Sequence, residues 1–264
     1  MNGGETRFRN VVWLLVAQTL GAFNDNVAKA MLPALAALVI GKAEMDPVNQ
    51  QVSLMLILPF VLFGPFAGWL SDRFSKRKVT SIALFAQVLG LAVLCVGMGM
   101  ELFYLSLAGF FLLAIQSAML SPAKKGILKE LVGSEKLGMA VGWMEMLTMV
   151  GILAGAFAGA RGFDALVENE GGWRAGLWIS ASVGVLAVIS WIIFQPTPEV
   201  EPRSKKPFRL SVLFSHFHDL AELWKVKPLR LAALGDAWFW AFGTFFYLVL
   251  VKLSGEVVEG DVGM

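Results

Sequence analysis

Seven stretches of this sequence are each long and apolar enough to cross a lipid bilayer as a helix. The hydrocarbon core of a bilayer is about 30 Å thick, and a helix needs about 20 residues to span it. The stretches cover residues 11–38, 52–70, 79–98, 102–120, 138–160, 173–194 and 231–253. Only 16% of the 264 residues are charged, whereas soluble domains average about 25%. The sequence therefore predicts an all-α membrane protein.

The rest of the composition excludes several other classes. A net charge of +2 is too small for nucleic-acid binding, which depends on neutralising many phosphates. One cysteine, Cys95, and two histidines leave no disulfide and no set of zinc ligands. The sequence contains no H-x-x-x-x-D, G-x-S-x-G or P-loop motif, each of which would indicate an enzyme. We expect no metal, no cofactor, no nucleic-acid partner and no catalytic residue.

The basic residues are distributed unevenly between the two sides of the predicted spans. The N-terminus and every second loop carry seventeen Lys and Arg residues, and the alternate loops and the C-terminal end carry four. Cytoplasmic loops are enriched in Lys and Arg. We expect a multi-pass protein with a cytoplasmic N-terminus.

The order of the segments predicts three parts. Residues 1–194 hold six spans, residues 195–230 form a polar linker, and residues 231–264 begin a second set of helices. Leu213, Phe217, Leu220 and Trp224 recur at helical spacing in the linker, which favours an amphipathic helix on the membrane surface. Six spans, a linker and one more span correspond to half of a twelve-helix transporter and the first helix of its second half. We therefore expect the sequence to be a fragment that lacks its C-terminal half.

Charged residues inside predicted spans are candidates for function, because burying a charge in hydrocarbon is costly. Asp25 and Lys29 are four residues apart and share one helix face, and Asn24 and Asn26 flank the acid. A cation, an anion and amides together suit a zwitterionic headgroup. The alternative is a structural ion pair that only orients the helix.

Two more acidic residues lie within spans, Glu145 in residues 138–160 and Asp236 in residues 231–253. Each is either a functional group or a helix-packing or capping residue. In the span that contains Glu145, glycine recurs every fourth residue at Gly151, Gly155 and Gly159. Such a pattern lets two membrane helices approach closely.

One loop resembles a family signature. The stretch Gly68-Trp-Leu-Ser-Asp-Arg-Phe-Ser-Lys-Arg77 is similar to the loop G-x-x-x-D-R-x-G-R-K/R of the major facilitator superfamily, with Ser75 in place of the usual glycine. The resemblance implies a six-helix N-terminal bundle followed by transmembrane helix 7. It also implies that Gly68, Asp72, Arg73, Lys76 and Arg77 form a conformational lock, in which Asp72 faces a helix N-terminus of the second half.

Three further stretches resemble the bacterial lysophospholipid transporters of that superfamily. They are Gly21-Ala-Phe-Asn-Asp-Asn26, Gln116-Ser-Ala-Met-Leu-Ser-Pro-Ala-Lys124 and Gly142-Trp-Met-Glu-Met-Leu-Thr148. Lys125 departs from the family, which usually has an aromatic residue there. The resemblance implies a carrier in the bacterial inner membrane that moves lysophosphatidylethanolamine or lysophosphatidylglycerol from the outer to the inner leaflet.

In that interpretation the substrate-binding or gating residues come from these three stretches and from the charged residues inside the predicted spans. Asp25 and Glu145 contact the headgroup or gate its path, and Lys124 receives the phosphate near the cytoplasmic surface. The full set of candidates is Asn24, Asp25, Asn26, Lys29, Gln116, Lys124, Glu145 and Asp236. The partners are then the lysophospholipid, the bilayer and the missing half, with a cytoplasmic acyltransferase as a further candidate.

Three alternatives stay open from the sequence. The chain is the transporter module of a longer protein fused to acyltransferase and acyl-carrier-protein ligase domains, or a drug-efflux carrier of the same superfamily, or a half-transporter that acts only as a dimer. Headgroup choice, acyl-chain choice and ion coupling do not follow from the sequence.

Overall fold

The structure is a computed structural model that describes residues 3–199, 220–239, 241–243 and 245. The chain divides into two compact units, residues 1–209 and 210–264. Each unit is considered by itself.

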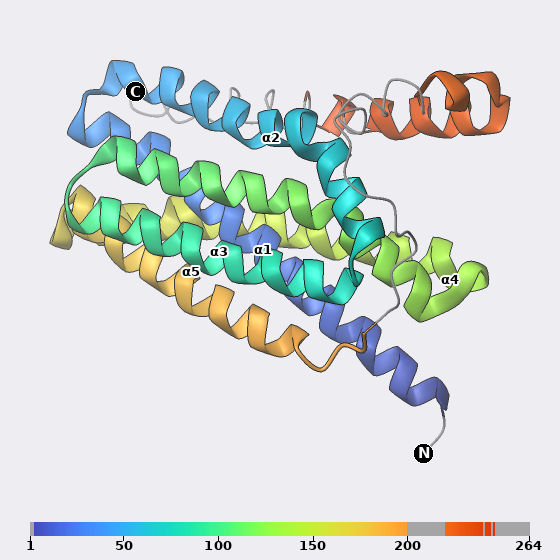
Figure 1. The fold of residues 1–264 in the computed structure, drawn as a ribbon. Coiled ribbons are helices and arrows are strands. Elements are labelled where there is room, and N and C mark those ends of the chain that lie inside the picture. Colours follow the sequence, from blue (N-terminus) through green and yellow to red (C-terminus); the bar gives the residue numbers. More distant parts are fainter. Residues whose placement is uncertain (1–2, 200–219, 240, 244, 246–264) are drawn as a thin grey trace, which may run out of the picture. The chain divides into compact units, whose positions relative to one another are not determined.

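The first unit is a bundle of long helices (Figure 1). In chain order they are α1 (Gly3–Val39), the short 3-10 helix η1 (Lys42–Glu44), α2 (Met45–Arg73), α3 (Lys76–Gly99), α4 (Phe103–Glu170) and α5 (Gly172–Phe194). Helix α4 packs against each of α1, α2, α3 and α5. It therefore contacts all the other long helices of the unit.

Helix α4 consists of two arms that meet at Gly133. The backbone there has φ 74° and ψ 173°, a conformation that is essentially restricted to glycine. In Figure 1 the chain reverses near the α4 label and returns through the bundle. Gly171, with φ 77° and ψ 164°, separates α4 from α5 in the same way. The first unit thus holds six long helical segments among its described residues.

These segments follow the predicted spans closely. The predicted span 173–194 corresponds to α5, and the spans 102–120 and 138–160 lie in the two arms of α4. The helices α3, α4 and α5, and the segment Lys42–Arg73 that contains α2, are long and apolar enough to cross a membrane. Helix α1 is absent from that set, and the polar run Asn24-Asp25-Asn26 lowers the hydropathy of its middle.

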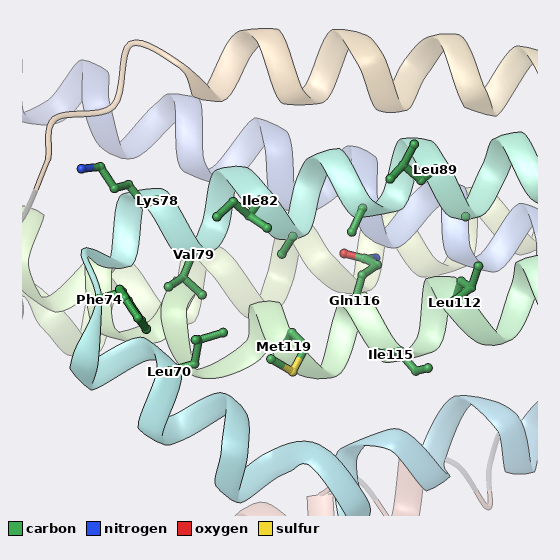
Figure 2. A pocket seen from close by; sticks show the side chains of 13 residues that line it. Leu70, Phe74, Lys78, Val79, Ile82, Leu89, Leu112, Ile115, Gln116 and Met119 are labelled. Carbon is green, nitrogen blue, oxygen red and sulfur yellow. The ribbon is translucent and has the colours of Figure 1, made fainter. Parts of the chain in front are cut away.

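An apolar cavity of about 540 Å³ lies between the C-terminal end of α2, α3 and the first arm of α4 (Figure 2). Lys78 lies at one end of it, whereas Leu89 and Leu112 lie at the other.

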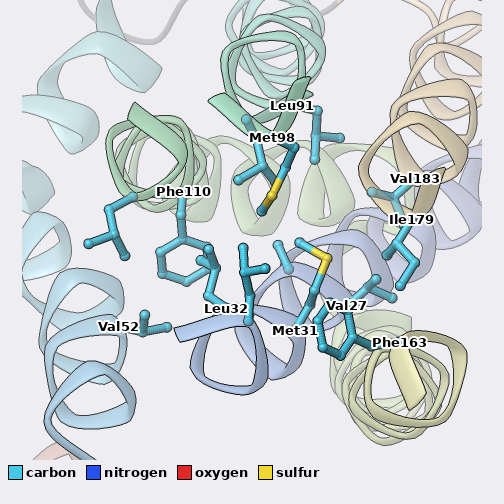
Figure 3. Close-up of a cluster of buried hydrophobic side chains, with 14 of the residues drawn as sticks. Val27, Met31, Leu32, Val52, Leu91, Met98, Phe110, Phe163, Ile179 and Val183 are labelled. Carbon is cyan, nitrogen blue, oxygen red and sulfur yellow. The ribbon is translucent and has the colours of Figure 1, made fainter. Parts of the chain in front are cut away.

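Two apolar clusters fill the interior of the bundle. One includes Leu14 of α1, Leu84 of α3 and Ile127 of α4. The other includes Met31 and Leu32 of α1, Leu91 and Met98 of α3, Phe110 and Phe163 of α4, and Ile179 and Val183 of α5 (Figure 3). Along α1, α3 and the first arm of α4, a few residues separate the two clusters. The buried polar residues among them form the candidate site.

In the second unit the structure describes helix over residues 220–225 and 227–239. Asp236 lies on the second of these helices. Much of the predicted amphipathic helix, with Leu213 and Phe217, lies outside the described residues, as does the end of the predicted span 231–253 from residue 246 onward.

Candidate functional site

The candidate site is a layer of polar residues between the two apolar clusters. Helix α1 contributes Asn24 and Asp25, which are 0% and 8% exposed. Helix α3 contributes Gln87, and the first arm of α4 contributes Gln116 and Ser117. We refer to these five residues as the polar layer. Because apolar side chains lie on both sides of it along each helix, the layer is at the middle of the bundle.

Asp25 is the centre of the polar layer. Gln87 Nε2 donates to Asp25 Oδ1 at 3.0 Å, and Ser117 Oγ donates to Asp25 Oδ2 at 2.6 Å. Gln87 Nε2 also contacts the carbonyl oxygen of Gly21 at 3.2 Å. Each carboxylate oxygen thus has a donor from a different helix, and the acid connects α1 to both α3 and α4. Charge-assisted hydrogen bonds of this kind are stronger than neutral ones.

The amides of the polar layer have unused hydrogen-bonding capacity. Gln116 Nε2 donates to Ser117 Oγ at 2.9 Å. Within the described part of the chain, Oε1 of Gln87, Oε1 of Gln116 and both polar atoms of the Asn24 side chain are buried without a hydrogen-bond partner. Buried polar atoms in proteins are nearly always paired. The polar layer can therefore offer both donors and acceptors to a ligand.

The predicted residues that follow Asp25 in α1, Asn26 and Lys29, are less buried. The Asn26 side chain donates to the carbonyl oxygen of Ala22 at 2.8 Å within α1. Lys29 is half-buried one turn beyond Asp25. Asn26 is thus engaged with its own helix, and Asn24 and Asp25 are the members of the run that are buried in the bundle.

A second cluster of charged residues, Lys124, Lys125 and Glu145, lies on α4. Lys124 interacts electrostatically with both Asp25 and Glu145, and Lys125 Nζ lies 3.7 Å from Glu145 Oε1. The predicted residues Lys124 and Glu145 are therefore brought together, although they are on different arms of α4. Lys125, the residue that departs from the family pattern, is the ion-pair partner of Glu145.

The close approach of α1 to the second arm of α4 depends on three glycines. A Cβ atom added at Gly151 would lie 2.6 Å from the carbonyl oxygen of Thr19, and one at Gly159 would lie 2.6 Å from that of Val27. Gly155 lies against the carbonyl oxygen of Phe23 between them. The predicted glycine pattern is thus the surface on which α1, the helix that carries Asp25, is packed.

The residues of the predicted lock loop between α2 and α3 contact several different partners. Lys76 is 1% exposed, and its Nζ lies 2.7 Å from Glu130 Oε1. Arg77 donates to the carbonyl oxygens of Gln195 and Thr197 at 2.6 and 3.1 Å, beyond the end of α5. Arg73 lies 6.0 Å from the ring of Phe74. Lys76 and Arg77 therefore connect the loop to α4 and to the end of α5.

Asp72 and Gly68 differ from the other loop residues. Asp72 is exposed, and nothing in the described part of the first unit lies within 4 Å of a Cβ atom added at Gly68. The helix N-terminus that the resemblance places opposite Asp72 belongs to the second set of helices. Asp236 belongs to the second unit, whereas the polar layer belongs to the first.

Sequence reasoning missed Gln87 and Ser117. Gln87 lies in the long apolar run of α3, and an isolated amide in such a run is a signal of its own, since it must find a partner inside the membrane. Ser117 lies within the stretch Gln116–Lys124 that carries the resemblance. Neither residue could be connected to Asp25 before the packing of α1, α3 and α4 was known.

The comparisons with known proteins agree with this architecture. The family model described as Major Facilitator Superfamily matches residues 14–257. Three similar curated proteins are each named "Lysophospholipid transporter LplT". The protein of Enterobacter sp. (strain 638) is 34% identical over 89% of this chain and 55% of its own length. The protein of Serratia proteamaculans is 30% identical over 92% and 57%, and that of Salmonella paratyphi B is 31% identical over 92% and 57%.

The chain thus spans about half the length of the curated relatives that it matches. The family match covers most of the chain and agrees with a helical bundle whose helices are long enough to cross a membrane. This chain therefore belongs to the major facilitator superfamily and is an all-α, multi-pass membrane protein.

Proposed function

We propose that this chain forms the lysophospholipid-binding half of a carrier that moves lysophospholipids from the outer to the inner leaflet by alternating access. The observation that carries the proposal is the polar layer around Asp25, enclosed between two apolar clusters. The names of the relatives support the same substrate class. They favour neither the fused acyltransferase nor the drug-efflux alternative.

The chemistry of the polar layer suits a lipid headgroup. A carboxylate at Asp25 attracts an ammonium group such as that of an ethanolamine headgroup, and the buried amide of Asn24 has a donor and an acceptor to offer. Gln87 and Ser117 hold the carboxylate in the absence of substrate. An incoming headgroup has to replace or extend these hydrogen bonds.

The cluster of charged residues on α4 supplies the positive charge that a phosphate requires. Lys124, Lys125 and Glu145 are close to one another on α4, and Lys124 also interacts with Asp25. A phosphate binds ammonium groups through charge-assisted hydrogen bonds. Lys124 therefore takes the phosphate while Asp25 takes the ammonium group, and Glu145 balances the lysines when no lipid is bound.

The charge distribution supports the proposed sidedness and the proposed direction of transport. The basic loops mark the cytoplasmic side, and Lys124 lies toward that side of the polar layer. A lysophospholipid that has crossed the polar layer is thus met by a cation on the cytoplasmic side.

The test measures lysophospholipid uptake by the Asp25→Asn variant, made in the gene that encodes this chain. The matched control is Asp164→Asn. Both changes convert an acid to its amide, but Asp164 is exposed near the end of α4. We expect Asp25→Asn to abolish lysophospholipid uptake by spheroplasts at an unchanged protein level in the membrane, whereas Asp164→Asn keeps normal uptake. Normal uptake by Asp25→Asn would remove Asp25 from the site.

A further inference from the structure

The cavity between α2, α3 and α4 borders the polar layer but has a different character. Its volume is about 540 Å³, and its lining is apolar except for Lys78 and Gln116. Ile82 and Leu89 line it while being 68% and 52% exposed. The cavity is therefore a groove that is open along its side to the hydrocarbon of the bilayer. Gln116 forms a wall that the groove shares with the polar layer (Figure 2).

The length of the groove matches one leaflet. It follows α3 from Lys78 to Leu89, a distance of about 16 Å at the rise of a helix. Half of the hydrocarbon core is about 15 Å thick. The groove thus accommodates a single acyl chain that extends from the membrane surface to the middle of the bilayer.

A cation lies at the surface end of the groove. The side chain of Lys78 is 61% exposed, and its Nζ lies 3.5 Å from Glu199 Oε1. Exposed ion pairs of this kind are weak, so a phosphate can replace the carboxylate. The neighbouring Arg77 lies 3.8 Å from the same Glu199 oxygen and, unlike Lys78, is also held by hydrogen bonds to the backbone after α5. Lys78 is therefore the cation that the groove offers to a headgroup.

We propose that this groove binds a phospholipid of the surrounding bilayer, with one acyl chain between α2, α3 and α4 and its anionic headgroup at Lys78. The open side of the groove lets the second acyl chain remain in the bilayer. Phosphatidylglycerol has the required chemistry, because its headgroup carries a net negative charge. The headgroup end of the groove, at Lys78, is distinct from Asp25 and Lys124 of the proposed transport site, and binding to it requires no transport.

The experiment is photocrosslinking of the full chain in vesicles of phosphatidylethanolamine and phosphatidylglycerol. A trace of phosphatidylglycerol carries a diazirine in its acyl chain, and the labelled residues are identified by peptide mass spectrometry. We expect labels to concentrate on groove residues such as Ile82, Ala86 and Met119. The Lys78→Gln variant is expected to reduce groove labelling about fivefold, which corresponds to about 1 kcal/mol for one lysine near an anionic surface. The matched charge control is Lys129→Gln, an exposed lysine outside the groove.

A second pair of variants tests the groove itself. Ala86→Phe fills it, whereas Ala92→Phe adds the same bulk to an exposed position of α3 outside it. We expect only Ala86→Phe to abolish groove labelling, with both variants reaching the membrane at the level of the parent chain. Equal labelling of the groove and of the Ala92 face would overturn the proposal. A further competition experiment uses a photoactivatable lysophospholipid. If it labels the groove and excess phosphatidylglycerol does not reduce this labelling, the proposal is overturned and the groove is assigned to the transported lipid.

Discussion

At the scale of single residues, Asp25 depends on donors that come from two other helices. Its two oxygens accept hydrogen bonds from Gln87 and Ser117, and its side chain is enclosed between apolar clusters. A buried carboxylate that loses a donor has no water to replace it. The stability of the bundle and the chemistry of the site therefore depend on the same atoms.

This dependence predicts the effect of Gln87→Leu. The change leaves Asp25 Oδ1 without its donor, and we expect it to lower the free energy of unfolding by about 1–3 kcal/mol. In an Asp25→Leu background the same change should cost much less, because no carboxylate is left without a partner. Thermal unfolding in detergent of the parent chain, the two single variants and the double variant gives the coupling free energy between Gln87 and Asp25. Gln51→Leu, at an exposed position of α2, is the control, and equal costs in both backgrounds would contradict the pairing of Gln87 with Asp25.

At the scale of the elements, the contact between α1 and the second arm of α4 sets the position of the polar layer. Gly151, Gly155 and Gly159 bring the α4 backbone against the carbonyl oxygens of Thr19, Phe23 and Val27. These contacts extend along α1 on either side of Asn24 and Asp25. Any side chain at these glycines separates the two helices and moves Asp25 with α1.

We therefore expect Gly155→Leu to disrupt the bundle. Its side chain has no space against the backbone of Phe23, and overpacking a tight interior costs about 1–3 kcal/mol or more. The matched control is Gly142→Leu on the same arm, where nothing in the described part of the first unit lies within 4 Å of an added Cβ atom. The readout is the amount of folded protein recovered from membranes and its unfolding temperature. Similar behaviour of the two variants would show that the glycines are not a packing surface.

At the scale of the whole molecule, the distribution of Lys and Arg predicts which ends of the helices face the cytoplasm. Glu44 lies exposed between α1 and α2, whereas Glu135 lies exposed just after the bend of α4 at Gly133. In a Cys95→Ala background, we expect Glu44→Cys to react with a membrane-impermeant maleimide in intact cells. Glu135→Cys should react only after permeabilisation. The reverse pattern would place the N-terminus outside and would invert the proposed direction of transport.

The sequence by itself determined the class of protein and its helices. Apolar runs of sufficient length and the placement of charges are local properties, so the helices within residues 11–194 were visible in it, and Asp25 and residues 116–124 could be singled out as candidates. The resemblance of residues 68–77 to a superfamily loop was visible for the same reason, and the family match agrees with it.

Only the tertiary structure decided which side chains meet. Gln87 and Ser117 hold Asp25, and Lys76 is buried against Glu130. A groove remains between α2, α3 and α4. These features depend on how each helix is rotated and how closely it approaches its neighbours. Both properties arise from side-chain packing between segments far apart in the chain. A local pattern defines the apolar length of a helix, but the partner that its polar residues find is set by the close-packed interior as a whole.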